Sequence, residues 1–187
     1  MHAWLDDARR SGTLVRLTRG GVPEEDADVD GYVVAVGPEL VALHILSDRI
    51  DLDGYEVLRL RDLLAAVDGF PSDAFYRRAL EMKGETPAVP AWLDLSSLPA
   101  AIESIRRNQP LVVLHRERMA PGEVAVGYVR QSLPSGIRLH WITPQAEWED
   151  DPTLYRYDSI TRVQFGGEYE RTLAMVAGPP PNADSGS

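Results

Sequence analysis

The chain has 187 residues, of which 44% are hydrophobic and 26% charged, a composition typical of a folded globular protein. Its lack of cysteine excludes disulfides and thiolate sites, and the absence of a membrane-length apolar run or a signal peptide predicts a cytoplasmic protein without a membrane partner. The net charge is −10, with 10 basic against 16 acidic residues up to Lys83 and 9 against 13 after it, so nucleic-acid binding is not expected of either half.

The first half of the chain predicts one helix, five short strands and a closing helix. The first helix is expected over residues 3–10. Hydrophobic residues at alternate positions, such as Val41, Leu43 and Ile45, indicate strands with one buried face. Ser72 is a typical N-cap for the closing helix. The predicted strands are 14–17, 31–36, 41–45, 55–61 and 63–67.

The second half predicts the same order of elements. A helix is expected over residues 98–107, because Leu98, Ile102 and Ile105 share one helical face. A closing helix is expected from about Gly167. The predicted strands between the two helices are 111–114, 124–129, 137–141, 153–157 and 160–165.

An internal repeat relates the two halves. An offset of 96 residues aligns GYV at 31–33 with GYV at 127–129, and 8 of 32 ungapped positions are identical, where chance would give about two. The same offset aligns His44 with His140 and Asp62 with Asp158. We therefore predict a tandem duplication, with a first repeat at 1–83, a linker at 84–90, a second repeat at 91–177 and a disordered tail at 178–187.

A helix followed by five short strands, with the last two joined almost without a loop, resembles the Sm-like family of small SH3-type β-barrels. The resemblance concerns topology and covers about 55 residues of each half. It implies an α+β, mainly β fold: a tandem duplication of a helix plus a five-stranded Sm-like antiparallel barrel with a closing helix. The family's glycine-containing turn, which helps to hold RNA, has no counterpart in Leu60-Arg61-Asp62-Leu63 or Arg156-Tyr157-Asp158-Ser159, so the RNA function is not implied.

The fourth and fifth strands at the edges of the predicted barrels carry few inward-pointing charges and no proline. Such edges need to be paired, covered or charged. We therefore expect the two repeats to pack through a substantial apolar interface, as one cooperative unit with a pseudo-twofold axis.

Three aspartates form the best motif match. Asp26, Asp28 and Asp30, followed by Gly31, reproduce the first half of an EF-hand calcium loop. The expected twelfth-position glutamate is Gly37, and strands are predicted where helices should flank the loop. A solvated loop or an acidic edge strand is therefore the favoured interpretation, with the three aspartates as weak metal candidates.

His44, His140 and Trp148 are the remaining candidates for binding. The two histidines recur at one position of the repeat, where they would act as metal ligands, proton shuttles, interface groups or structural hydrogen-bonding residues. Trp148 lies in the acidic loop Glu147–Asp151, whose counterpart is Asp48–Asp53. Its indole is expected either to anchor a partner or to fold back over its own half.

The aspartates Asp62 and Asp158 are predicted to fix the turn between the fourth and fifth strands. The sequence holds no nucleophile-elbow, phosphate-loop or dinucleotide motif, so no catalytic residue and no cofactor is predicted. The leading hypothesis is a non-enzymatic binding or scaffold protein that contacts another protein or a second copy of itself. The alternatives are an RNA-binding regulator and an enzyme with a site between the two repeats.

Overall fold

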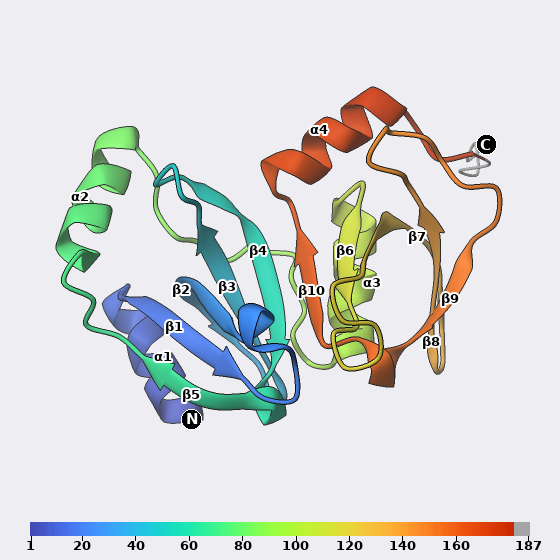
Figure 1. The fold of residues 1–187 in the computed structure, drawn as a ribbon. Helices are drawn as coiled ribbons and strands as arrows, with labels where there is room; N and C mark the ends of the chain where they lie inside the picture. The colour runs from blue at the N-terminus through green and yellow to red at the C-terminus, as the bar shows by residue number, and fades with distance from the viewer. Residues whose placement is uncertain (182–187) are drawn as a thin grey trace.

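The structure is a computed structural model that describes residues 1–181; the rest of the predicted tail, 182–187, lies outside the described residues. Figure 1 shows two halves of similar construction joined side by side. The helices are α1 (His2–Ser11), α2 (Asp73–Lys83), α3 (Leu98–Asn108) and α4 (Glu168–Ala177). The strands are β1 (Leu14–Arg19), β2 (Asp28–Val36), β3 (Leu40–Leu46), β4 (Leu52–Arg59), β5 (Leu63–Val67), β6 (Val112–His115), β7 (Val124–Leu133), β8 (Gly136–Trp141), β9 (Thr153–Arg156) and β10 (Arg162–Phe165).

The predicted helices and strands are confirmed individually, with shifts of a few residues at their ends. α3 illustrates why a local sequence pattern is enough to predict a helix. The Ser97 hydroxyl accepts a hydrogen bond from the Ala100 amide at 3.2 Å and caps the helix, whose buried face consists of Leu98, Ala101, Ile102 and Ile105. Ser72 and Gly167 likewise immediately precede α2 and α4.

The arrangement of the strands differs from the expected pair of barrels, and that prediction was wrong. All ten strands form one antiparallel open sheet, in the order β5-β1-β2-β3-β4-β10-β6-β7-β8-β9. β4 does not close a barrel with β5 of its own half but pairs with β10 of the other half, from Leu58 opposite Arg162 to Tyr55 opposite Phe165. The physical reason is that either arrangement satisfies the backbone groups at the edge of β4.

The junction between the halves is head-to-tail. β4 is the fourth strand of the first half, whereas β10 is the fifth strand of the second half. A pseudo-twofold axis would pair equivalent strands of the two halves, such as the two fourth strands. The expected pseudo-twofold relation was therefore wrong. One consequence is that the sheet ends in two different edges, β5 and β9.

A hydrophobic core runs across the junction. Val34, Leu40, Ala42 and Val57 of the first half belong to the same buried cluster as α3 and the core of the second half. A second cluster lies under α1 and includes Leu5, Val15, Leu17 and Leu43. The halves are therefore joined both by backbone pairing and by a common apolar core.

Local features recur in the two halves. The β2–β3 pairing shifts register between Val33 and Ala35, and the β7–β8 pairing shifts between Val129 and Gln131, 96 residues later. Beyond the following loop the offset becomes 97, because Val41 lies opposite Leu58 whereas Ile137 lies opposite Tyr155. The identity of Leu58 and Leu154 in the ungapped alignment is therefore not a structural equivalence.

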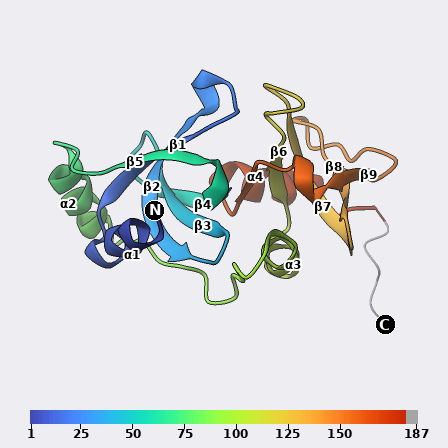
Figure 2. The ribbon, with the colours of Figure 1, turned by 90° about the horizontal axis from the view of Figure 1, so that it is seen from below.

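The segment between α2 and α3 has no regular secondary structure and crosses beside the sheet (Figure 2). Near its start, the Glu85 carboxylate accepts a hydrogen bond from the Leu52 amide at 2.6 Å. Farther along, the Tyr55 hydroxyl donates to the Ala88 carbonyl at 3.0 Å, and Leu95 is buried under α3. In the described part of the chain, no helix is long and apolar enough to cross a membrane.

Candidate functional site

A buried ionic cluster lies at the junction between the halves. Arg19 of β1 binds the carboxylate of Glu117 with two hydrogen bonds, of 2.9 and 3.3 Å, although the two residues lie in different halves. Arg162 of β10 approaches the same carboxylate at 3.2 Å, and the Thr161 hydroxyl contacts it as well. Burial by itself would raise the pKa of Glu117, but the hydrogen bonds from Arg19 and Thr161 lower it below its usual range.

The cluster continues along β4, β6 and β10. His115 Nδ1 lies 3.0 Å from Arg162 and its Nε2 lies 2.9 Å from the Gln164 side-chain oxygen, a pattern that fits a neutral ring with its proton on Nε2. Burial and the charge of Arg162 lower the pKa of His115. The Gln164 amide in turn donates to Glu56, which also faces Arg162 at 3.4 Å.

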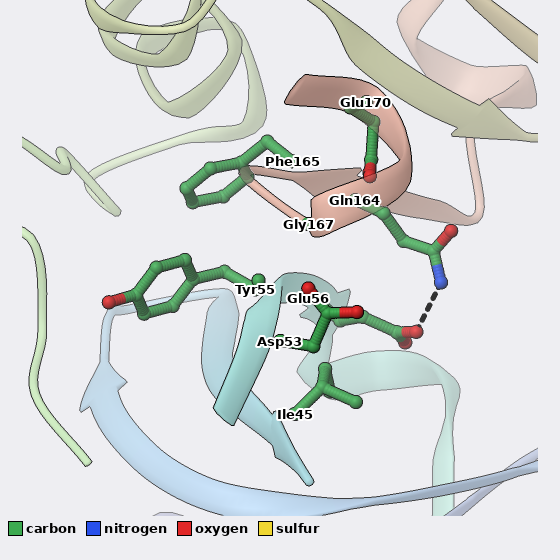
Figure 3. Close-up of a pocket in the computed structure, with 9 residues that line it drawn as sticks. Ile45, Asp53, Tyr55, Glu56, Gln164, Phe165, Gly167 and Glu170 are labelled. Atoms are coloured by element: carbon green, nitrogen blue, oxygen red, sulfur yellow. Dashed lines mark hydrogen bonds between the residues drawn. The ribbon is translucent and has the colours of Figure 1, made fainter. Parts of the chain in front are cut away.

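A pocket of 180 Å³ opens beside this cluster, between the two halves (Figure 3). Ile45, Asp53, Tyr55 and Glu56 line it from the first half. The second half contributes Gln164, Phe165, Gly167 and Glu170. We call this space the junction pocket; it lies where an enzyme with a site between the repeats would place its substrate.

Three carboxylates face the junction pocket. Glu56 is hydrogen-bonded to Gln164, and Asp53 accepts a hydrogen bond of 2.6 Å from the Glu168 amide at the start of α4. Glu170 is only 8% exposed, and burial, with a smaller contribution from Asp53, raises the pKa of its carboxyl. The pocket is therefore lined by three acidic side chains, of which Glu170 has its ionised form disfavoured by burial, and it presents mainly hydrogen-bond acceptors.

The two outer edges of the sheet form a second feature. β9 borders an open pocket of 410 Å³ lined by Arg116, Met119, Leu154 and Arg156, among others. Leu154 and Met119 are exposed, and the Arg116 guanidinium lies over the Tyr155 ring at 4.9 Å. At the opposite edge, β5 exposes Leu64 and Val67. Both edges thus combine unpaired backbone groups with exposed apolar side chains.

The arginines Arg59 and Arg156 occupy equivalent positions in the two halves, because Arg59 lies opposite Leu40 and Arg156 lies opposite Gly136. Arg59 donates hydrogen bonds to the carbonyls of Ile160 at 3.0 Å and Tyr157 at 2.5 Å, just before β10. Arg156 contacts the nearby Asp158 at 3.1 Å and is largely exposed. The second half thus presents the same donor at an edge that no strand covers in the described residues.

The three aspartates of the calcium motif lie apart from both features. Asp30 forms two hydrogen bonds with Arg16, of 2.7 and 2.6 Å, and Asp28 accepts one from Thr18 at 2.6 Å. Asp26 belongs to a short 3₁₀ turn, and its carbonyl accepts from Arg19. Within residues 1–181, no group of three acidic or histidine side chains is placed to hold a metal ion.

The two predicted histidines have different surroundings. His44 stacks on Tyr55 at 4.2 Å, its Nδ1 accepts a hydrogen bond from the Ala88 amide, and burial lowers its pKa to about 4. His140 is buried, its Nε2 lies 2.6 Å from the Glu149 carbonyl, and Trp148 meets it edge-on. The histidines are thus separate, and Trp148 folds back onto its own half.

The predicted turn aspartates also differ. Asp62 is buried and pairs with Arg118 of the other half at 2.7 Å, whereas Asp158 is exposed and pairs with Arg156. They are not equivalent, because the turns run from Leu60 to Asp62 and from Tyr157 to Ser159, an offset of 97. Asp62 therefore contributes to the junction and Asp158 to the β9 edge.

The residues missed by sequence reasoning are Arg19, Glu56, Glu117, Arg162 and Glu170. Glu56 and Arg162 carried a weak signal, since Glu56 is a charge between Tyr55 and Val57 inside β4, and Arg162 is a charge at the first position of β10. No local pattern joins them, because Arg162 lies 106 residues from Glu56. Only the pairing of β4 with β10 brings them together.

Comparisons with known proteins do not assign the chain to a family. No protein-family model matches the sequence, and neither a curated protein nor a solved structure matches it. The resemblance to the Sm-like family therefore stays a prediction.

Proposed function

We propose that this chain is a non-enzymatic protein-binding module that associates through its sheet edges, and that its partner is a second copy of itself. In this proposal the chain is a tandem duplication that works in the cytoplasm. β9 of one copy pairs with β5 of the next, as β4 pairs with β10 inside the chain. The main support is that the free β9 edge carries side chains equivalent to those that β4 uses at the internal junction.

The side chains of β9 support this proposal. Leu154 occupies the position of Val57, since they lie opposite Arg138 and Ala42, 96 residues apart. Val57 is 1% exposed at the internal junction, whereas Leu154 is 54% exposed at the free edge. A hydrophobic residue of this size gains about 1 to 2 kcal/mol when it is buried, so covering β9 would be favourable.

The arginine at the end of β9 adds specificity. Arg59 binds two carbonyls that precede β10. By the offset of 97, their counterparts are the carbonyl of Leu60, which precedes β5, and that of Leu63, the first residue of β5. Arg156 would donate to these carbonyls in a second copy, and the charge-assisted hydrogen bonds would fix the register of the new strand pair.

The chemistry of β5 suits the partner role. Its sequence, Leu-Leu-Ala-Ala-Val, contains no charge and no proline, so its outer backbone groups are free to extend a sheet. Such pairing joins different edges of two copies, and each added copy offers a new free edge. The association is therefore expected to grow beyond a dimer or to close into a ring.

Two single-edge variants test the proposal. Leu154→Glu places a charge on β9, and Leu64→Glu places one on β5; each variant should be monomeric in native-mass or light-scattering measurements. An equimolar mixture should stop at a dimer, because only one β5 edge and one β9 edge remain usable. Wild-type protein should form larger species at high concentration.

The control is Met82→Glu, which changes a highly exposed residue of α2 away from both edges. It should associate like the wild type. A wild-type chain that stays monomeric up to submillimolar concentration, or a Leu154→Glu chain that associates as the wild type does, would contradict the proposal.

A further inference from the structure

We propose that the junction pocket binds a primary ammonium group, carried by a small alkylamine or by the lysine side chain of a protein, between the carboxylates of Asp53, Glu56 and Glu170. This site is distinct from the sheet edges and does not depend on self-association. Its lining comes from β3, β4, β10 and the start of α4, so a bound cation would contact both halves.

The Glu170 carboxylate is the main reason to expect a ligand. It is more than nine-tenths buried and lines the pocket, facing the side from which Asp53 and Ile45 approach (Figure 3). Among the described residues, no side chain donates a hydrogen bond to it; the hydrogen bond that favours its ionised form comes from its own backbone. A buried carboxylate whose hydrogen bond comes only from its own backbone leaves acceptor positions unused, so a ligand with N–H groups would be stabilised there.

The neighbouring charges favour a cation. Asp53 and Glu56 add two carboxylates, and the arginines that pair with them, Arg171 and Arg162, offset only part of their charge. Arg162 also binds Glu117, and Arg171 lies 3.8 Å from Asp53 with its side chain mostly exposed. An incoming ammonium group would therefore meet a net negative field in a partly enclosed space.

The size and shape of the pocket restrict the kind of cation. Its 180 Å³ is room for about six water-sized groups. The carboxylates are not placed to coordinate one metal ion together, whereas an ammonium group offers three donors that reach acceptors farther apart. Ile45, Tyr55 and Phe165 supply apolar contacts for the methylene stem of an alkylammonium.

Calorimetric titration of the full chain with butylamine, with butanol as the uncharged isostere, tests the site directly. N-acetyl-lysinamide in a parallel titration distinguishes the two sources of the ammonium group. Binding of butylamine supports a free amine, and binding of the lysine derivative alone supports a protein side chain. Binding of neither, or equal binding of butanol, overturns the proposal.

Two variants locate the site. Glu170→Gln keeps the size of the side chain and removes its charge, and it should weaken amine binding about 10-fold or more. Glu168→Gln is the matched control, because this exposed residue lies on the same helix outside the pocket and should bind as the wild type does. Asp53→Asn, which keeps an oxygen for the Glu168 amide, should also weaken binding. Unchanged affinity in both pocket variants would overturn the assignment.

Discussion

Arg19 and Glu117 come from different halves of the chain and form an ion pair whose side chains are only 1% and 3% exposed. The pair is part of a cluster rather than an isolated contact, since Arg162 and Thr161 also bind the Glu117 carboxylate. Glu117 therefore compensates two buried guanidinium groups at once. The shared carboxylate explains how two arginine side chains can be buried at the junction between the halves.

Removal of the Glu117 carboxylate should strongly destabilise the protein. Glu117→Ala leaves Arg19 without a carboxylate partner, so the free energy of unfolding should fall by about 3 kcal/mol or more. Urea denaturation followed by circular dichroism measures this change. The double variant Arg19→Met with Glu117→Leu removes both charges and should lose less stability than Glu117→Ala alone.

Glu123→Ala is the control for that comparison, because Glu123 belongs to the same connection between β6 and β7 but is exposed. It should change the free energy of unfolding by at most about 0.5 kcal/mol. If Glu117→Ala were as mild as Glu123→Ala, the ionic cluster would not contribute to the stability of the junction.

The His44 ring makes stability depend on pH. Burial lowers its pKa from 6.5 to about 4, so between these values the unfolded chain binds a proton that the folded chain does not. The contribution of His44 to the free energy of unfolding should therefore be full above pH 6.5 and should decrease as the pH drops towards 4. His115, whose pKa burial also lowers, adds to the same trend.

His44→Gln should remove its own part of this dependence. Because the ring is partly solvated, we expect that part to be about 1 to 2 kcal/mol between neutral pH and pH 4. Free energies of unfolding of the variant and the wild type, measured at several pH values, should converge as the pH falls. Two parallel curves would contradict the assignment of a lowered pKa to His44.

The local elements could be predicted from sequence because their signals are local. The alternation of Val41, Leu43 and Ile45 predicted β3, and the starts of α2 and α4 were expected at about Ser72 and Gly167, the residues that immediately precede them. The choice of partner for β4 is not a local property. Closing a five-stranded barrel and pairing with β10 satisfy the same edge groups, and the sequence of β4 does not distinguish them.

The candidate sites were harder to predict for the same reason. Glu56, Arg162 and Glu170 become neighbours of one pocket or cluster only after β4 meets β10. The alignment of the halves also suggested Asp62 and Asp158 as equivalent residues. The chain between paired positions of β8 and β9 is one residue longer than between those of β3 and β4, which shifts the later elements to an offset of 97 and aligns Ser159 with Asp62.

The two halves of the chain should depend on each other for folding. Residues 1–86 and 87–187, expressed as two chains, should each be insoluble or only partly folded. The first chain would expose the β4 edge together with Val57, Leu40 and Ala42, and the second would expose the edge of β10. The buried ions would also lose their partners, because Arg19 and Glu117 would lie on different chains.

Mixing the two chains should restore a native-like complex, since β4–β10 pairing and the common core need no covalent link between the halves. Far-ultraviolet circular dichroism and urea denaturation of each chain and of the mixture measure this recovery. A single cooperative transition should appear only in the mixture. Two well-folded, monomeric halves with native-like stability would instead show that the junction contributes little, and that the common core and the ionic cluster are dispensable for folding.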